Sequence, residues 1–373
     1  MSKKKLSIII PRHNEPDEVI DGLLSCIKRQ ILLDKNDVEV VISSDISREI
    51  GVKVEENLQI TRVNCDGVGG PGPNRQNGLD VAVGDKILFI DADDMLDSPT
   101  TLHDVIQASQ GCDLLHFGFR EEYVDNDGNH YLIPHPNNIT WVFGKVYDRK
   151  FLVDHNIRFS PDLLYHEDSY FNLLMSFYHP VVKALPINGY IWRYNENSIT
   201  RANGAEYTYS ALSQFMDAIS AAITESDERG VLDPVDKNNR SAALLGTIFG
   251  YLQDPAFNNY SRYVEDCEAK VYDYLITKDP FLTCLYPYNA VAVNNGIMSG
   301  TSKWGMDRGV SPKNAETFVM FIMRVYYDNL KKSHPDKEFN DRPIIPSFEA
   351  GIKNIKDSLH IENKKEKEVE TVE

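Results

Sequence analysis

Short apolar runs alternate with helix-like segments over the first 90 residues of the chain. The runs with the length of buried strands are Leu6 to Ile10, Val38 to Ile42 and Ile87 to Ile90, and Leu58 to Val63 is predicted to be a further strand. Between them, apolar residues recur at helical spacing from about Asp17 to Ile31 and again near Leu79 to Val83. Alternating strands and helices are typical of a mostly parallel sheet with right-handed crossovers. The pattern therefore predicts an α/β domain with a Rossmann-like sheet flanked by helices.

Three carboxylates follow the last of these runs, in the sequence Asp91-Ala92-Asp93-Asp94. Open α/β sheets bind their ligands at the carboxyl ends of the strands, where this cluster is expected. Crowded carboxylates repel one another, and Mg²⁺ or Mn²⁺ would relieve that repulsion while binding substrate phosphates. The alternative is an ordinary acidic turn. Pro11 to Glu15 and Asp45 follow earlier strands and are predicted to lie at the same edge.

The remaining chain predicts a hairpin and then a change of architecture. Tyr123 to Tyr131 contains an Asp-Gly turn, whose acidic residues we expect to stabilise the turn. Helices are expected over Lys150 to Asn156 and from Glu167 to Tyr178, and a strand over Asn188 to Arg193. After about residue 203, long helical patterns replace the alternation. The predicted division is an α/β domain over 1–205, a helical domain over 206–360 and a disordered charged tail over 361–373.

Composition narrows the classes of function and partner. The formal net charge of −17 disfavours passive attraction to a nucleic-acid backbone. The five cysteines show no CxxC spacing, which disfavours a disulfide framework or a zinc site. Since no run reaches the roughly 18 apolar residues of a membrane span, we expect a cytoplasmic protein without integral membrane segments.

Two motif matches are rejected. Gly67 to Gly72 matches G-x-G-x-x-G, but a dinucleotide loop must join a strand to a helix with free first amides, and Pro71 and Pro73 lack amide hydrogens. Read as a calcium loop, the segment from Asp91 has Met95 at its fifth position, where an oxygen ligand is needed.

Several segments taken together resemble the family 2 glycosyltransferases with the GT-A fold. In the first half, Ser7 to Glu15 resembles the opening strand with its P-x-Y-N-E turn, Asp45 to Ser47 the D-G-S element, Gly70 to Gly78 the G-x-x-x-A-R-N-x-G segment and Asp91 to Asp94 the D-x-D-D element. In the second half, Trp141 to Tyr147 and Ile157 to Phe159, followed by Glu167-Asp168, resemble the W-x-K-x-Y and E-D elements. Tyr190 to Arg193 and Asn197 to Arg201 resemble the closing strand and its S-I-T loop. His13, Ser44 and Gln76 depart from the family pattern. The resemblance spans about residues 6 to 201 and implies an inverting, metal-dependent hexosyltransferase.

Roles for individual residues follow from this resemblance and from their chemistry. Asp93 is the first metal ligand, for Mn²⁺ or Mg²⁺, and Asp91 assists it or binds the ribose of the donor. Asp168 is the general base, because the acceptor hydroxyl must lose its proton as it attacks. The predicted residues of the donor site, a UDP-sugar site, are Pro11, Asn14, Glu15, Asp45, Arg75, Asp91, Ala92, Glu167, Arg193, Ser198 and Arg201.

Simpler alternatives stay open for several of these residues. Asp94 could cap a following helix, Asp45 could be a turn aspartate and Arg75 could form a surface salt bridge. Glu167 and Asp168 could merely favour a helix N-terminus, and His166 could be structural. Arg193, Ser198 and Arg201 are expected to close over the diphosphate as a loop orders, with a structural role as the alternative.

Other classes of function also stay open. One is a catalytically silent module that binds a sugar nucleotide or glycan, and another is a nucleotidyltransferase. The acceptor could be a surface glycan, a teichoic-type polymer or a modified nucleobase. The aromatic helices after residue 205 could form an acceptor platform or the interface of a homo-oligomer, although an internal core is the simpler interpretation.

Overall fold

The computed structural model describes residues 4–45, 52–55, 57–64, 69–125, 127–136, 141–196, 198 and 204–233. The chain divides into two compact units, Met1–Ala202 and Asn203–Glu373. In the second unit the described residues include helix α7, Gly204–Glu228. The other expected C-terminal helices and the charged tail lie outside the described residues. Of the described helices, none combines the length and apolarity needed to cross a bilayer.

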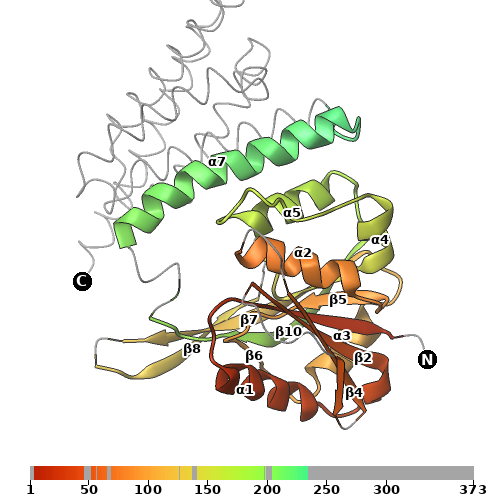
Figure 1. Ribbon diagram of the computed structural model, residues 1–373, viewed down its shortest axis with the longest axis vertical. Helices are drawn as coiled ribbons and strands as arrows, with labels where there is room; N and C mark the ends of the chain where they lie inside the picture. Colours follow the sequence, from red (N-terminus) through yellow and green to blue (C-terminus); the bar gives the residue numbers. More distant parts are fainter. Residues whose placement is uncertain are drawn as a thin grey trace, which may run out of the picture. The chain divides into compact units, whose positions relative to one another are not determined.

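The first unit is a mixed sheet with helices on both faces (Figure 1). Its strands are β1 (Leu6–Arg12), β2 (Val38–Ser44), β3 (Val52–Glu55), β4 (Leu58–Asn64), β5 (Lys86–Phe89), β6 (Met95–Leu96), β7 (Leu114–Val124), β8 (His130–His135), β9 (Lys145–Asp148) and β10 (Val182–Trp192). Its helices are α1 (Asp17–Lys28), the 3₁₀ helix η1 (Lys35–Asp37), α2 (Pro71–Val81), α3 (Thr101–Ala108), α4 (Arg149–Asp154) and α5 (Glu167–Ser176).

The strand order is β3-β4-β2-β1-β5-β9-β7-β10-β6, and β8 pairs with β7. Strands β4, β2, β1 and β5 are mutually parallel, and β7 and β10 run in the same direction. The carboxyl ends of these strands therefore meet at one edge, as predicted. Strand β9 lies antiparallel between β5 and β7, which places its first residue, Lys145, at that same edge. Strands β3 and β9 were not predicted, because each has four residues and is too short for a clear sequence pattern.

The core forms where the strands pack against helices on each face. Helix α1 contributes the buried residues Ile20, Leu23, Leu24 and Ile27, which recur at helical spacing. On the opposite face, α2 approaches β1 through Gly78, where an added Cβ would lie 2.4 Å from Ile9 Cγ2. Glycine is therefore required at this crossing, and α2 lies against the part of β1 that leads to the site.

Helix α2 follows β4, so the G-x-G-x-x-G match does join a strand to a helix. The helix begins at Pro71, and Pro73 lies in the same turn, so two first-turn positions lack the amide hydrogens of a phosphate loop. The prolines therefore argue against a dinucleotide loop, as predicted from the sequence.

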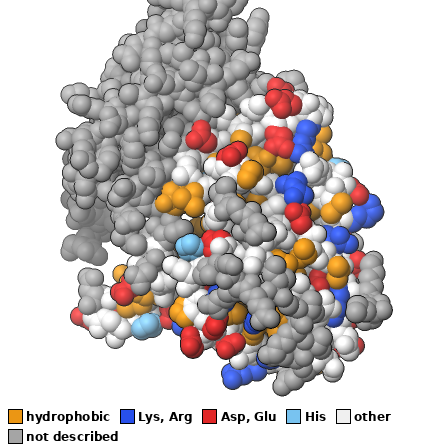
Figure 2. Space-filling view, viewed as in Figure 1, with side chains coloured by type: hydrophobic (Ala, Val, Ile, Leu, Met, Phe, Trp, Pro, Cys, Tyr) orange, Lys and Arg blue, Asp and Glu red, His pale blue; other side chains and the backbone are white. Residues whose placement is uncertain are grey.

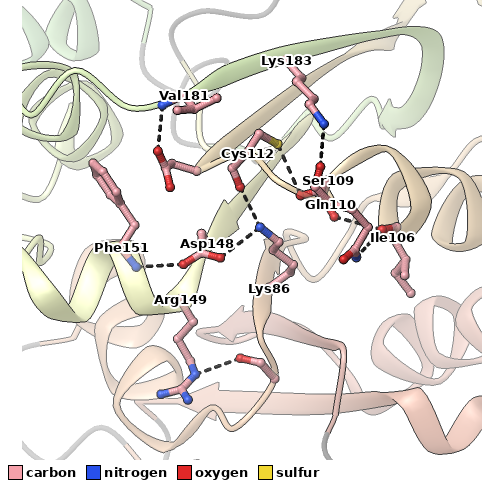
Figure 3. Close-up of polar contacts among 12 residues, drawn as sticks. Lys86, Ile106, Ser109, Gln110, Cys112, Asp148, Arg149, Phe151, Val181 and Lys183 are labelled. Carbon is pink, nitrogen blue, oxygen red and sulfur yellow. Dashed lines mark hydrogen bonds and ion pairs between the residues drawn. The ribbon is translucent and has the colours of Figure 1, made fainter.

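A network of hydrogen bonds connects β5, β9 and α4 at the edge of the sheet opposite the carboxyl ends of the parallel strands (Figure 3). Lys86 on β5 donates to Asp148 Oδ2 on β9 at 3.0 Å and to the Cys112 carbonyl at 2.7 Å. Asp148 also caps α4 by accepting from Phe151 N at 2.8 Å, and Arg149 donates to the Gly84 carbonyl. This network fixes β9 beside β5 and so holds the position of Lys145 at the other end of the strand.

The predicted hairpin is confirmed by strands β7 and β8. Asp125 Oδ1 accepts hydrogen bonds from the backbone amides of Asp127 and Asn129, both at 2.9 Å. The acidic residue at this position therefore stabilises the turn, as predicted.

Candidate functional site

The carboxyl edge of β1, β2 and β5 brings together residues that lie far apart in the sequence. Pro11 and Arg12 pair in register with Ser43 and Ser44, so the end of β1 lies beside the end of β2. Ile90 N donates to the Ile9 carbonyl at 3.1 Å, which places the acidic turn beside β1. The predicted cluster of Pro11 to Glu15, Asp45 and the acidic turn therefore lies at one edge.

Asp45 is a buried carboxylate directly after β2. Its side chain is 7% exposed, and its Oδ2 lies 2.6 Å from His13 Nδ1. Within the described part of the chain its Oδ1 is buried and has no hydrogen-bond partner. Gly69 packs against this carboxylate, since an added Cβ would lie 2.7 Å from Asp45 Oδ2. A buried acceptor atom without a partner is costly, so this atom is suited to an N–H group of a ligand.

The turn after β1 is held by its own side chains. Glu15 accepts from His13 N at 2.8 Å, and the guanidinium of Arg12 donates to the Glu15 carbonyl. Asn14 is exposed on this turn and Pro11 is buried. The carboxylate of Glu15 therefore orders the turn in this structure.

Arg75 on α2 bridges two acidic residues that come from different elements. Its guanidinium donates to Asp91 Oδ1 at 2.6 Å and to Glu167 Oε1 at 2.5 Å. The side chain is only 6% exposed, so a surface salt bridge, one alternative for Arg75, is wrong. Burial by itself would lower the pKa of Arg75, but the charges of Asp91 and Glu167 raise it above its ordinary value. The bridge fixes the acidic turn relative to the start of α5.

Asp94 is the structural member of the acidic turn. It is buried and accepts from Tyr190 Oη at 2.5 Å and from Arg193 N at 2.8 Å. Helix capping, the alternative for Asp94, is wrong because β6 follows the turn and α3 begins only at Thr101. Burial, together with the charges of Asp91 and Asp93, raises the pKa of Asp94 well above its ordinary value. Asp94 therefore anchors the turn to the end of β10.

Asp91 and Asp93 remain the residues suited to a cation. No group of three potential metal-ligating side chains occurs among the described residues. Asp91 accepts through Oδ1 from Arg75, and Asp93 accepts through Oδ2 from Asn195 Nδ2 at 2.8 Å. Among the described residues, neither carboxylate uses its second oxygen in a hydrogen bond, which leaves that oxygen for a ligand. This donor set fits Mg²⁺ or Mn²⁺, which bind proteins through one or two carboxylates and complete their shell with water and phosphate oxygens.

The start of α5 separates its two acidic residues. Glu167 is buried against Arg75, and burial raises its pKa to about 7 in spite of the guanidinium. Asp168 stays partly exposed and accepts from Ser169 N at 2.7 Å. Burial of its carboxyl group raises its pKa, which the charges of Arg75, His166 and Lys145 oppose. Asp168 is thus the carboxylate of this pair that a second substrate could reach.

His166, just before α5, has a left-handed backbone with φ of 61° and offers no side-chain cap to the helix. Such a conformation costs energy in a residue other than glycine, and strained residues cluster at functional sites. Glu167 and Asp168 both lie in the first turn of α5, so the alternative that they merely stabilise the helix N-terminus through the helix dipole also stays open.

Lys145 is a site residue for which no role was predicted from the sequence. It is 1% exposed, and its Nζ donates to the backbone carbonyl of Trp141. Burial lowers the pKa of Lys145 to about 7, although the charge of Asp168 acts in the opposite direction. The W-x-K-x-Y match was the sequence feature that could have indicated a role for this lysine. Its burial beside Asp168, however, depends on the position of β9.

The closing loop is described only in part. Arg193 is about half exposed, and its Nε lies 4.0 Å from Glu122. Ser198 N donates to the Asn195 carbonyl at 3.1 Å, and Ala92 is buried. Arg201 lies outside the described residues, so closure over a diphosphate stays a prediction.

Comparison with known proteins gives a family match and several relatives. Residues 7–162 match the model of glycosyl transferase family 2. The chain is 30% identical over 222 residues to the uncharacterized glycosyltransferase EpsJ of Bacillus subtilis, covering 52% of this chain and 62% of EpsJ. It is 31% identical over 102 residues to the poly(ribitol-phosphate) β-N-acetylglucosaminyltransferase TarS of Staphylococcus aureus, covering 26% of this chain and 17% of TarS. The chain therefore spans less than two thirds of the length of these relatives.

Solved structures show the same fold. The crystal structure of S. aureus TarS residues 1–349 with UDP has a TM-score of 0.56 at 18% identity, covering 90% of this chain and 94% of that one. Its complex with UDP-GlcNAc has a TM-score of 0.51 at 17% identity, covering 90% and 93%. The expected α/β architecture of a mostly parallel sheet flanked by helices is confirmed.

Proposed function

This chain belongs to the family 2 glycosyltransferases, and we propose that it moves a sugar from a UDP-sugar to an acceptor hydroxyl with inversion of the anomeric centre. The observation that carries the proposal is the Arg75 bridge, which joins the acidic turn to the start of α5. A carboxylate pair suited to a metal and diphosphate thus lies near a separate carboxylate suited to act as a base. The UDP and UDP-GlcNAc complexes of TarS support a UDP-sugar as the donor.

On the donor side, the unpartnered Oδ1 of Asp45 would accept an N–H of the uracil base. Asp93 and Asp91 would hold Mn²⁺ or Mg²⁺ through their remaining oxygens, in a GT-A-type D-x-D arrangement. When bound, the cation neutralises the negative charge that develops on the leaving diphosphate. Arg75 keeps Asp91 in place, since its guanidinium is buried between two carboxylates.

On the acceptor side, Asp168 would take the proton of the attacking hydroxyl. Glu167 is held by Arg75 and is therefore not placed to act as a second nucleophilic carboxylate. One base without a nucleophile supports a single displacement, and a single displacement inverts the anomeric centre.

The proposal is tested by measuring UDP release from a panel of UDP-sugars with Mn²⁺, with Mg²⁺ and after EDTA treatment. We expect release from at least one donor, its loss with EDTA and its return when Mn²⁺ is added. Asp93→Asn should raise the Mn²⁺ concentration needed for half-maximal rate, because it removes one anionic ligand. Asp80→Asn makes the same charge change on the exposed surface of α2 and should leave that concentration unchanged.

Other outcomes would identify the competing functions. Binding of a UDP-sugar without turnover of any donor would identify a silent binding module. Release of pyrophosphate from UTP and a sugar phosphate would instead identify a nucleotidyltransferase.

Lys145 provides a test through the pH dependence of the reaction. The charged groups near Asp168 are Arg75, His166, Glu167 and Lys145. Lys145→Met keeps the bulk of the side chain and removes a cation, so the pKa of Asp168 should rise further. The base works when deprotonated, and the acidic limb of kcat/KM against pH should therefore move upward by up to about one pH unit.

The matched control for this measurement is Lys150→Met. Lys150 is an exposed lysine on α4, and its ion pair is with Asp154. Lys150→Met should leave the acidic limb of the profile of kcat/KM against pH at the same pH as in the unmodified chain. An unmoved limb in Lys145→Met would show that Lys145 acts only on the Trp141 carbonyl.

A further inference from the structure

A stack of three aromatic rings leads from the acidic turn to the protein surface. Tyr190, whose hydroxyl binds Asp94, stacks on Phe143 with ring centroids 4.7 Å apart and an interplanar angle of 8°. Phe143 in turn stacks on Trp141 at 5.5 Å and 10°. The three rings are therefore nearly parallel, and the stack begins at the carboxylate cluster of the site.

Trp141 ends this stack and is exposed. Its exposed fraction is 37%, whereas Phe143 and Tyr190 are buried. Phe119 meets Trp141 edge-on at 5.5 Å, and Trp192 packs against it at 5.7 Å with a tilt of 45°. An indole ring that is fixed on several sides and open to solvent can receive a flat apolar surface at little cost in conformational entropy.

The position of Trp141 is linked to the predicted base. Its backbone carbonyl accepts from Lys145 Nζ, and Lys145 interacts electrostatically with Asp168. Trp141 also precedes β9, whose first residue lies at the carboxyl edge of the parallel strands. The exposed ring therefore belongs to the acceptor side of the site.

The charges around this ring disfavour a polyanionic acceptor. Among the described residues, the arginines of the site and of strand β7 and the end of β10 each have a carboxylate partner: Arg75 has Asp91 and Glu167, Arg120 has Asp97, and Arg193 has Glu122. Lys145 is buried. Figure 2 shows Lys and Arg side chains lying beside Asp and Glu on the visible face of the described residues. Arg75, Arg120 and Arg193 are thus paired with carboxylates and Lys145 is buried, so these four cations are not free to bind a chain of phosphates.

We propose that Trp141 forms an acceptor subsite on which the pyranose ring of a neutral glycan stacks. This inference rests on the proposed glycosyltransferase activity and adds the class of the acceptor. The C–H groups on one face of a pyranose carry partial positive charge, and the face of an indole ring is negative, so the two attract. An acyclic polyol phosphate such as ribitol phosphate lacks that flat face and needs free cations instead.

The test measures binding without requiring turnover. Saturation-transfer NMR is recorded with the full chain, UDP and Mn²⁺, using methyl β-glycosides of glucose, galactose and N-acetylglucosamine as probes and ribitol phosphate as the comparison. We expect at least one pyranoside to bind, with transfer concentrated on the protons of one ring face. Trp141→Ala should weaken that binding by about tenfold or more, the effect of losing one aromatic stacking partner. Trp141→Phe keeps a ring and should retain most of the affinity.

The matched control is Tyr131→Ala, which removes an exposed aromatic ring from hairpin strand β8. It should leave pyranoside binding unchanged. Where an acceptor supports turnover, Trp141→Ala should raise the KM for that acceptor by about tenfold while the KM for the UDP-sugar changes less than about twofold.

Unchanged pyranoside binding in Trp141→Ala would overturn the inference, as would binding of ribitol phosphate in place of every pyranoside. Either result is distinct from failure of the proposed function, which is the absence of UDP release by the unmodified chain. A melting temperature close to that of the unmodified chain shows that each variant has folded.

Discussion

Asp168→Asn is expected to lower kcat for sugar transfer by about 10²–10⁴-fold, the contribution of a positioned general base. Asparagine has the shape of aspartate and can keep the hydrogen bond from Ser169 N, so the start of α5 should stay intact. It cannot take a proton from the acceptor hydroxyl. Glu167 should not substitute, because its carboxylate is held by Arg75 at 2.5 Å. The measurement is product formation under saturating donor and acceptor, together with the affinity for UDP.

The matched control is Asp162→Asn, which makes the same chemical change at an exposed position before α5. It should keep the full rate. If Asp168→Asn retained more than about a tenth of the activity, another group would have to be the base. An equal loss in kcat and in UDP affinity would also argue against this role, because a base that acts on the acceptor has no direct contact with the nucleotide.

The fold could be predicted where short-range patterns decide it. The apolar run Ile87 to Ile90 ends in the acidic turn, and the structure places that turn at the carboxyl edge of β5. Helix α1 was predicted from the spacing of its buried face. Strand β9 was not predicted, because its four residues sit between β5 and β7 through pairings with partners far along the chain. Such pairings leave no local period in the sequence.

The same distinction applies to the site. Asp45, Asp91 and Asp168 could be proposed because each follows a strand or begins a helix in a matched motif. The partners of Arg75 could not, since Asp91 and Glu167 come from separate elements and meet it only after folding. Lys145 illustrates the same limit, because its burial beside Asp168 depends on the position of β9.

The Arg75 bridge leads to the second large effect, which concerns stability. Arg75→Met is expected to lower the free energy of unfolding by about 3–5 kcal/mol, because it leaves the buried Glu167 and the partly exposed Asp91 without their counter-charge. Arg158→Met is the matched control: its ion pair with Asp80 is exposed and should contribute no more than about 1 kcal/mol. The measurement is urea unfolding followed by tryptophan fluorescence, since Trp141 and Trp192 both lie in the first unit.

The loss in free energy of unfolding caused by Arg75→Met, here called the deficit, should depend on pH, and that dependence identifies its cause. In the folded chain the pKa of Glu167 is already raised to about 7 from an ordinary 4.5, and loss of the guanidinium should raise it further. A carboxyl group whose pKa is higher in the folded than in the unfolded state destabilises the fold as pH rises between the two values. Between pH 4.5 and about 7 both chains lose this stability alike, because Glu167 is protonated in the fold of each. The Glu167 part of the deficit should therefore change little below about pH 7 and grow above it, and adding Glu167→Gln should recover part of it. A deficit independent of pH, or no larger than that of Arg158→Met, would mean that uncompensated charge is not its source.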